Sequence, residues 1–425
     1  MKIAIVGSGI SGLASAWLLG ARHEVTLFEQ DARLGGHSNT VDVTLDGVTA
    51  GVDTGFLVHN DRTYPNLVAL FSALGVRVAA SDMSFSVRLE ARDLEWCGTS
   101  LNTLFAQRRN LARPAFWVML QDILRFNRAA PRLLAATRNR DLTLGELVEQ
   151  ERYGTAFRDW YLLPMGAAIW SCPTSRMLAF PAHAFLAFCS NHGLLQIRDR
   201  PQWKTVEGGS RVYVERRAAA IPDVRTSSPV RCVQRTDRGV RIMTDATDGT
   251  WDHVILACHS DQALRLLVDR SQAESEILAS IAYQPNRAML HTDTSFLPRR
   301  PRAWAAWNYQ AGRPGPDEQP VAVTYLLNRL QPLPFRQPVM VTLNPHREPD
   351  PAHVLDEMTY AHPLLDSAAW RAQQRLSEIQ GVRRTWFAGA WTGYGFHEDG
   401  LDSALRVANA LGTSAVWQKM PVATT

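Results

Sequence analysis

The sequence predicts an α/β protein in which one doubly wound domain is assembled from three separate stretches of chain. A glycine-rich turn joins an apolar strand to a helix at the N-terminus, and apolar strands recur at 252–260 and 384–391. The chain between them indicates a second, α+β domain with a mixed or antiparallel sheet and a helical part. We place the first domain at 1–75, 200–270 and 376–425, and the second at 76–199 and 271–375.

Composition restricts the class of protein. The 425 residues are 46% hydrophobic, which supports a large core, and 45 basic against 41 acidic residues leave a net charge of +4, too small to indicate a nucleic-acid partner. No window reaches the ~20 apolar residues of a spanning helix. The cysteines are widely spaced without a metal-binding pattern, so we expect a cytoplasmic protein without a metal site. They are Cys97, Cys172, Cys189, Cys232 and Cys258.

A glycine pattern follows the first predicted strand. Gly7, Gly9 and Gly12 form G-x-G-x-x-G at the start of a helix. Gly7 allows the tight turn, Gly9 lets a pyrophosphate approach the backbone, and Gly12 allows the helix to pack closely on the strand. The helix N-terminus then faces the anion. The pattern predicts a Rossmann-type dinucleotide site with contacts from Gly7, Gly9, Ile10, Ser11 and Gly12.

An acidic residue closes the second predicted strand. Glu29 stands at about the ~20-residue spacing from the turn at which a carboxylate reaches the two hydroxyls of a ribose. A 2′-phosphate would be repelled by this charge, so we expect an unphosphorylated adenosine.

The segment after Glu29 distinguishes FAD from NAD. Arg33 and the pair Gly35 and Gly36 follow the acid, and "VDTGFLVHN" comes next. Here the sequence resembles the flavin-dependent amine oxidase and phytoene desaturase superfamily, which implies FAD. In that superfamily the arginine and the glycine-pair amides meet the diphosphate and ribityl chain, and both groups suit a pyrophosphate. The resemblance implies further contacts from Gln30, His37, Thr54, Gly55 and Phe56, and from the backbone of Val230 at the adenine.

Aromatic residues of the second domain are candidates for a cavity wall. Strand-like segments such as "RAWAAWNYQ" and "PVAVTYLLNRLQ" can build a sheet over a cavity. The same residues can equally pack an ordinary core, and both interpretations stay open. The candidates for a substrate pocket are Tyr161, Trp170, Trp307, Tyr309 and Tyr325.

Residues 107–141 form a strongly basic stretch. It contains eight arginines and one acid inside it, Asp122, with apolar and aromatic residues interleaved. A basic amphipathic helix suits contact with an anionic membrane surface, while a solvated helix face over a core has the same pattern. Under the first interpretation, the helical part near 105–140 faces lipid, and the protein works at the inner face of the membrane.

The C-terminal strand, loop and helix resemble the last piece of the superfamily's flavin site. There Gly389 ends the strand, and Gly400 and the Leu401 amide approach the ring edge where negative charge collects. Many members carry an acid directly after the strand glycine, but this chain has Ala390. We expect Glu398 or Asp399 to make that ribityl contact instead. No cysteine lies in the joint, so the FAD is expected to be non-covalent.

Two residues are candidates for catalysis. An imidazole at His397 could accept a proton while a hydride leaves for the flavin N5, since its ordinary pKa is about 6.5. It could instead cap the helix or orient Glu398. Many amine oxidases keep a lysine near N5, where this chain offers Arg287, or His291 in a shifted register. This difference argues against a plain amine oxidase.

Over nearly its whole length the sequence resembles one bacterial branch of the superfamily, through segments such as "YLLPMGAAIWS" and "FAGAWTGYGFHEDGL". The branch is associated with enzymes that methylate or cyclopropanate phospholipid acyl chains. The resemblance implies desaturation of a methylated fatty acyl chain, with an unknown electron acceptor. The alternatives are oxidation of a small or polyamine-like amine, FAD-dependent isomerisation of a double bond, and a non-catalytic, flavin-bound partner subunit.

Overall fold

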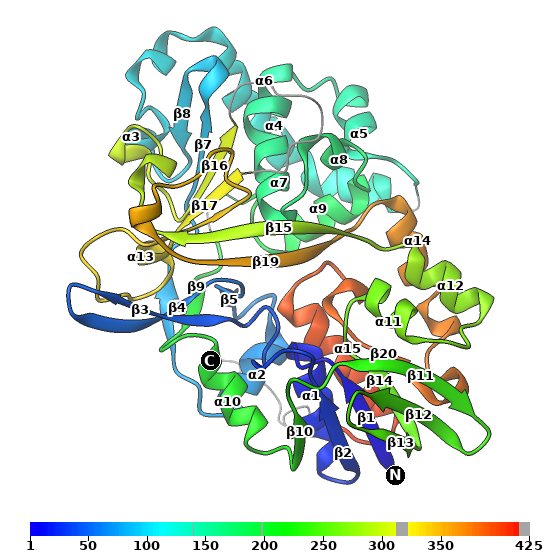
Figure 1. The fold of residues 1–425 in the computed structure, drawn as a ribbon. Helices are drawn as coiled ribbons and strands as arrows, with labels where there is room; N and C mark the ends of the chain where they lie inside the picture. Colours follow the sequence, from blue (N-terminus) through cyan, green and yellow to red (C-terminus); the bar gives the residue numbers. More distant parts are fainter. Residues whose placement is uncertain (139, 197–198, 312–321, 416–425) are drawn as a thin grey trace.

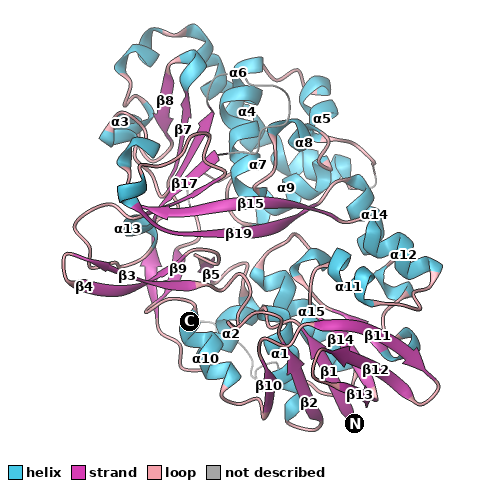
Figure 2. Cartoon of the chain, viewed as in Figure 1, coloured by secondary structure: helices cyan, strands magenta, loops and turns pink. Residues whose placement is uncertain are grey.

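The computed structural model describes residues 1–138, 140–196, 199–311 and 322–415 (Figures 1 and 2). Its two main sheets lie in different halves of the molecule, with the first and last parts of the chain together in the lower half of Figure 1. The predicted α/β fold is confirmed. No helix among these residues is long and apolar enough to cross a membrane.

A five-stranded parallel sheet forms the centre of the lower half. Its order is β10-β2-β1-β14-β20, and every neighbouring pair is parallel. β1, β2, β14 and β20 are largely buried, and they are nearly continuous apolar runs rather than alternating ones. The edge strand β10 is only half-buried and contains two charged residues. The strands are β1 (Lys2–Val6), β2 (Glu24–Phe28), β10 (Asp223–Arg225), β14 (His253–Leu256) and β20 (Thr385–Phe387).

Helices from distant parts of the sequence cover this sheet. α1 (Ile10–Gly20) packs against α15 (His397–Ala410), and α2 (Pro65–Ala73) packs against α15 in turn. The antiparallel strands β11 (Val230–Thr236), β12 (Gly239–Thr244) and β13 (Asp248–Trp251) form a side sheet. The remaining helices here are α10 (Arg211–Ala218), α11 (Ser260–Leu266), α12 (Gln272–Ala279) and α14 (Ser367–Gln374).

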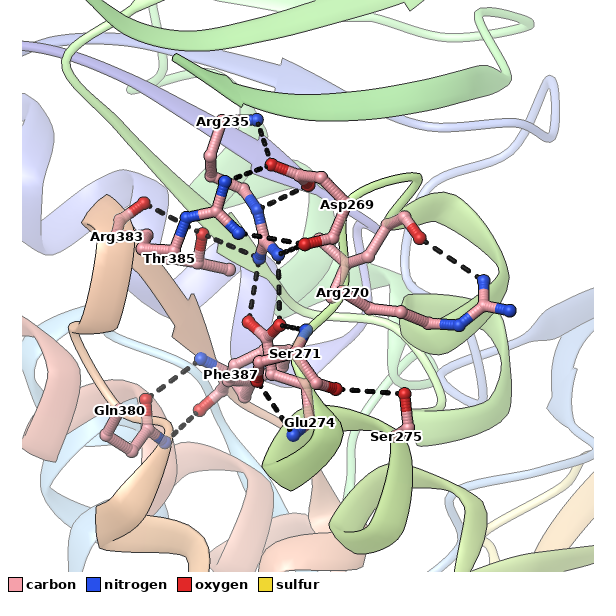
Figure 3. Close-up of polar contacts among 11 residues, drawn as sticks. Arg235, Asp269, Arg270, Ser271, Glu274, Ser275, Gln380, Arg383, Thr385 and Phe387 are labelled. Carbon is pink, nitrogen blue, oxygen red and sulfur yellow. Dashed lines mark hydrogen bonds and ion pairs between the residues drawn. The ribbon is translucent and has the colours of Figure 1, made fainter. Parts of the chain in front are cut away.

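A buried ion-pair cluster ties the side sheet to α12 (Figure 3). The Arg235 guanidinium donates to both carboxylate oxygens of Glu274, at 2.7 and 2.9 Å, and both side chains are 2% exposed. Arg235 Nε also lies 2.7 Å from Asp269 Oδ1. Arg383 donates to the Asp269 carbonyl at 2.8 Å, so the segment leading into β20 joins the same cluster.

The upper half is built on a mixed seven-stranded sheet of order β19-β15-β18-β17-β16-β7-β8. β16 and β7 pair in parallel, and the other neighbours are antiparallel. The long β15 and β19 run along the boundary with the lower half in Figure 1. The strands are β7 (Phe85–Leu89), β8 (Leu94–Cys97), β15 (Ala282–His291), β16 (Trp307–Ala311), β17 (Ala322–Leu326), β18 (Met340–Leu343) and β19 (Val354–Leu364).

A helical layer lies beside this sheet, to its right in Figure 2. The longest helix, α4 (Pro114–Thr137), packs against α6 (Thr155–Phe157) and α9 (Ala182–Asn191). Shorter helices complete the layer: α5 (Leu144–Gln150), α7 (Leu163–Trp170) and α8 (Thr174–Leu178). The short helices α3 (Leu101–Leu104) and α13 (Leu327–Leu330) lie apart from it, at the left of Figure 2.

Two small sheets lie between the halves. They are β3 (Thr40–Leu45) with β4 (Val48–Asp53), and β5 (His59–Asn60) with β9 (Trp203–Val206) and β6 (Val78–Ser81).

Candidate active site

One cavity of about 1170 Å³ connects the two halves of the molecule. It begins at the glycine turn after β1, where parallel strands end and nucleotides bind in such sheets. It continues past the start of α15 into the space under the mixed sheet. A dinucleotide site and an apolar pocket are therefore parts of one continuous space.

The glycine turn forms an open cradle at the start of α1. Gly7 has φ +100°, a value that favours glycine, and a Cβ on Gly12 would lie 1.8 Å from the Gly7 carbonyl oxygen. A Cβ on Gly9, in contrast, would meet no atom within 4 Å. Gly9 is the N-cap of α1 and no side chain caps the helix. Unpaired amides next to open space suit a diphosphate.

Glu29 lies in the cavity wall beside this cradle. Its Oε2 accepts hydrogen bonds from the Ser8 amide at 2.8 Å and the Ser8 hydroxyl at 2.6 Å, and its Oε1 accepts from the Asp31 amide at 3.0 Å. These bonds hold the carboxylate at the end of β2, the position predicted for ribose recognition.

The loop of residues 33–38 packs on the glycine turn of residues 7–12. The Gly35 amide donates to the Ser8 carbonyl at 3.1 Å, and a Cβ on Gly36 would lie 3.2 Å from Gly9 Cα. Arg33 lines the cavity and donates to the carbonyls of Gly36 and Ser38, at 2.9 and 3.2 Å. Glycine amides and a guanidinium thus border the cradle, and this donor set fits the diphosphate of FAD.

Most of the predicted cofactor residues line the cavity. Gly12 does not, because it is used for the close packing of α1 on the first turn. Those that line it are Gly7, Gly9, Ile10, Ser11, Glu29, Gln30, Arg33, Gly35, Gly36, His37, Thr54, Gly55, Phe56, Val230 and Gly389.

The predicted ribityl contact from Glu398 or Asp399 is wrong. Glu398 accepts hydrogen bonds from the amides of Asn66 and Leu67, at 2.8 and 3.0 Å, and so caps the N-terminus of α2. Asp399 accepts from the Phe396 amide at 2.8 Å and caps its own helix. Both carboxylates stabilise helix starts, where negative charge is favoured.

Gly400 and Leu401 also lie outside the cavity lining. Leu401 is fully buried, and the Gly400 carbonyl accepts a hydrogen bond from Ser11 Oγ at 2.9 Å. A Cβ at position 400 would lie 2.8 Å from the Ile10 side chain. The glycine therefore allows α15 to pack against α1, and the wall at this end is formed by earlier residues of the joint, from Gly389 to His397.

His397 lines the cavity, but its imidazole is engaged. Nε2 lies 3.0 Å from Ser38 Oγ and 3.1 Å from the Tyr213 hydroxyl, and the ring stacks on Phe56 with 3.8 Å between centroids. Burial, with a smaller contribution from His59, lowers its pKa to about 3. A neutral, hydrogen-bonded imidazole of this kind holds neighbouring loops in place, and its geometry argues against the predicted role as proton acceptor.

The predicted catalytic role of Arg287 is wrong. Its side chain is 38% exposed and pairs with Glu348 and Glu357, each at 2.6 Å, away from the cavity lining. The alternative candidate, His291, is wrong too. Its side chain is fully buried, and its Nε2 lies 2.7 Å from Thr342 Oγ1. Both residues stabilise the sheet around β15.

Four of the five predicted pocket residues line the cavity. They are Tyr161, Trp170, Trp307 and Tyr325, and the rings of the last two lie 4.8 Å apart. The prediction for Tyr309 is wrong, because it packs in the core outside the lining. The sequence analysis missed further wall residues, although the alternating pattern around β7 and β8 could have indicated some of them: Met83, Phe85, Trp96, Phe188, Leu343 and Phe396.

Three histidines that the sequence analysis did not single out also line the cavity: His192, His259 and His362. His37, a predicted cofactor contact, lies 5.3 Å from His362 and 6.3 Å from His259, measured between ring centroids. Burial is the largest cause that lowers the pKa of His37, His259 and His362. His192 bonds through Nδ1 to the Phe188 carbonyl at 3.0 Å. These residues come from separate elements, so no local pattern could reveal the group.

A cysteine lies closer to the joint than expected. Cys258 lines the cavity, and its carbonyl accepts a hydrogen bond from Trp391 Nε1 at 3.1 Å. Burial raises the pKa of its thiol to about 12, so the sulfur stays protonated and unreactive. A non-covalent flavin remains our expectation.

Acidification is expected to destabilise the protein below pH 6.5. A buried histidine whose folded pKa is depressed binds fewer protons than it does in the unfolded chain, so stability falls as pH drops from 6.5 towards the folded value. At about pH 5.5 each such residue costs about 1 kcal/mol. The pKa is lowered, mainly by burial, to about 4 at His59, His192, His291 and His362 and to about 3 at His397.

Two carboxylates act in the opposite direction. Burial raises the pKa of Asp53 and Asp399 to about 6, so their contribution to stability grows as pH falls through that value. Five histidines against two carboxylates leave a net loss of a few kcal/mol at about pH 5.5. Urea unfolding at pH 7.5 and 5.5 measures it, and equal midpoints would contradict this balance.

Comparison with known proteins places the chain in a family. Residues 10–343 match the family model for flavin containing amine oxidoreductase, and the chain belongs to that family. A carotenoid phi-ring synthase from Streptomyces griseus is 28% identical over 334 residues, which cover 74% of this chain. The chain spans 61% of the length of that curated relative.

Solved structures of similar shape cover nearly the whole chain. A CLA-producing fatty acid isomerase from P. acnes has a TM-score of 0.68 at 16% identity, covering 96% of this chain and 97% of that one. Putrescine oxidase bound to putrescine has a TM-score of 0.65 at 18% identity, covering 97% of this chain and 99% of that one. Cyclohexylamine oxidase from Brevibacterium oxydans IH-35A has 0.67 at 15%, also covering 97% and 99%. These likenesses show the fold.

The family match and the cradle together define the class of enzyme. The protein is a flavoprotein of the flavin containing amine oxidoreductase family, and its cradle fits the diphosphate of FAD. The residues that would hold the cofactor are those of the double-loop cradle, and Glu29 and Arg33 both line the cavity there.

Proposed function

We propose that this enzyme desaturates a long apolar substrate, namely a methylated fatty acyl chain of a phospholipid. The resemblance to the bacterial branch associated with methylated and cyclopropanated acyl chains supports this substrate. When bound, FAD supplies the acceptor for a hydride and its electron pair. The residues of this chain would bind the acyl group, exclude water and place the reacting carbons.

The observation that carries the proposal is the apolar character of the cavity in the substrate half. Its wall there consists mainly of aromatic and aliphatic side chains. Among the described lining residues of 76–199 and 271–375, Asp82 is the one carboxylate, and it is engaged by the Ser84 amide at 2.7 Å and by Arg329 at 3.3 Å. The other carboxylates of the lining, Glu29, Asp31 and Asp261, lie in the nucleotide half. A cationic amine finds no free carboxylate partner in such a wall, whereas an alkyl chain is stabilised by it.

The phenols in the wall stay uncharged. Burial raises the pKa of Tyr161 and of Tyr325, so neither side chain introduces a negative charge. Desaturation removes a proton as well as a hydride, and an imidazole is the group suited to accept it. Burial lowers the pKa of both His192 and His397. His192 is the candidate on geometry, because its Nε2 makes no hydrogen bond among the described residues, whereas Nε2 of His397 is engaged.

The test follows absorbance of the bound flavin under argon. Methyl-branched phospholipid should bleach the flavin band, and the recovered lipid should be lighter by two hydrogens. The matched control is the same phospholipid without the methyl branch, which should bleach the band more slowly. Unchanged absorbance over many equivalents of the branched lipid would overturn the proposal.

Oxidation of a small amine is the second candidate, favoured by the family and by the shape shared with putrescine oxidase. It predicts prompt bleaching by putrescine or cyclohexylamine and peroxide release in air. The shape shared with a fatty acid isomerase supports a third, isomerisation, for which the product mass would be unchanged. A flavin-bound partner subunit would show neither bleaching nor a product.

A further inference from the structure

The exposed large apolar side chains of this protein are concentrated in one segment. Of the ten found among the described residues, five lie between 101 and 124, and the other five are spread over the rest of the chain. We call this segment the 101–124 patch. Its five members are Leu101 (76% exposed), Leu111, Trp117, Val118 and Leu124. Such clustering marks an interaction surface.

Contacts join two members of the patch, Leu111 and Trp117. Trp117 Nε1 donates to the Leu111 carbonyl at 2.9 Å, and its ring lies 5.3 Å from that of Phe105. These contacts hold the segment before α4 against the exposed first turns of the helix. Leu124 lies two turns further along α4 than Trp117, which follows from 3.6 residues per turn.

Arginines without carboxylate partners border the patch. Arg108 bonds to the Phe105 carbonyl and to Asn102, and Arg113 bonds to Asn110 and to backbone carbonyls. Arg128 is exposed and makes no ion pair or hydrogen bond with another described residue. These guanidiniums keep their charge available, which indicates an anionic partner.

The cavity reaches the surface beside the same patch. Gly98 and Thr99 line the cavity and are exposed. Ser100 separates them from Leu101, and Thr103 of α3 donates to the Cys97 carbonyl at 3.1 Å, which fixes α3 beside this turn. An acyl chain that leaves a membrane bound at Leu101 would therefore meet the Gly98–Thr99 turn, because only Ser100 separates the two.

We propose that the 101–124 patch docks on an anionic phospholipid bilayer and that an acyl chain enters the cavity between this surface and the Gly98–Thr99 turn. Apolar side chains flanked by unpaired arginines are complementary to an acyl layer beneath anionic headgroups. The entry of an acyl chain rests on the proposed function, whereas docking does not.

Binding to vesicles tests the docking. The holoenzyme is mixed with vesicles of phosphatidylglycerol and phosphatidylethanolamine without methyl branches, or of phosphatidylcholine alone, and floated on a density gradient. We expect binding to the anionic vesicles. The double variant W117S/V118S should bind them roughly tenfold more weakly. The matched control V268S/L355S, which removes exposed apolar side chains elsewhere, should bind as the original does.

A charge reversal tests the arginines. R128E should weaken binding to anionic vesicles several-fold, and raising the salt should reduce the difference. The control R238E reverses an exposed arginine in the turn between β11 and β12 and should leave binding unchanged. All variants should keep the flavin spectrum and melting temperature of the original, which shows that they fold.

Three results would overturn the docking: no flotation with anionic vesicles, equal flotation of W117S/V118S, or flotation that depends on another protein. These vesicles contain no proposed substrate, so docking and desaturation can fail separately. If docking holds and detergent-dispersed branched lipid is not oxidised, the proposed function fails while the surface stands. If the protein oxidises the dispersed branched lipid but does not float with anionic vesicles, the docking fails while the proposed function stands.

Discussion

Valine at position 9 is expected to abolish FAD binding without unfolding the protein. A Cβ at Gly9 meets no protein atom within 4 Å, and φ is −64°, an ordinary value for any residue. The space it enters is the cradle before the first amides of α1. Branched methyl groups there exclude the diphosphate and its bonds to the helix start. We expect FAD affinity to fall more than about 100-fold, or about 2.7 kcal/mol.

The measurement compares apoproteins first and then their titration with FAD. Circular dichroism melting of G9V apoprotein should match that of the original, and flavin fluorescence should show no saturable binding. The matched control is G20V, at the other end of α1, where a Cβ also meets nothing within 4 Å. G20V should bind FAD normally. A yellow, fully loaded G9V protein would refute the assigned cradle.

Replacing Glu274 by alanine is expected to cause the largest loss of stability. The substitution leaves the Arg235 guanidinium, 2% exposed, with Asp269 as its remaining carboxylate. Breaking a buried pair from one side costs about 3–5 kcal/mol, because a charge stays in a medium that solvates it poorly. The expected loss is near the lower end, since Asp269 still compensates part of the charge.

Urea unfolding of E274A measures this cost. The control D245A removes one partner of an exposed pair, Arg231 with Asp245, whose side chains are 59% and 69% exposed. That change should cost less than about 1 kcal/mol. The double replacement R235M/E274M should be more stable than E274A, because no buried charge remains unpaired. Equal losses for E274A and D245A would show that the cluster in Figure 3 contributes little.

The two largest predictions depend on different kinds of information. The importance of Gly9 is visible in the sequence, because a glycine turn, a helix start and a terminal acid occur at fixed spacing. The importance of Glu274 is not, because Arg235 lies 39 residues away in sequence and in a different element. Local patterns report what neighbouring backbone must do, and long-range pairs leave no such trace.

The site residues whose predicted roles proved wrong are also residues whose environment is set by long-range contacts rather than by a local sequence pattern. Glu398 looks free in the sequence and is taken by the amides of Asn66 and Leu67, more than 300 residues earlier. Arg287 looks like a substitute for a catalytic lysine, yet two glutamates hold it at the surface. Tyr309 and Tyr325 occur on neighbouring strands, and only the second reaches the cavity.

The sequence by itself determined the class of this protein. The first turn, Glu29, Arg33 and the glycine pair are local features whose chemistry follows from residue type and spacing, and they indicated FAD and an α/β fold. Only the tertiary structure decided which polar groups remain available. It engages His397 and Glu398 with distant partners and Asp399 with an amide at the start of its own helix, because burial makes an unpaired polar group costly. It also leaves five large apolar side chains of 101–124 exposed, close in the chain to the cavity-lining Gly98 and Thr99.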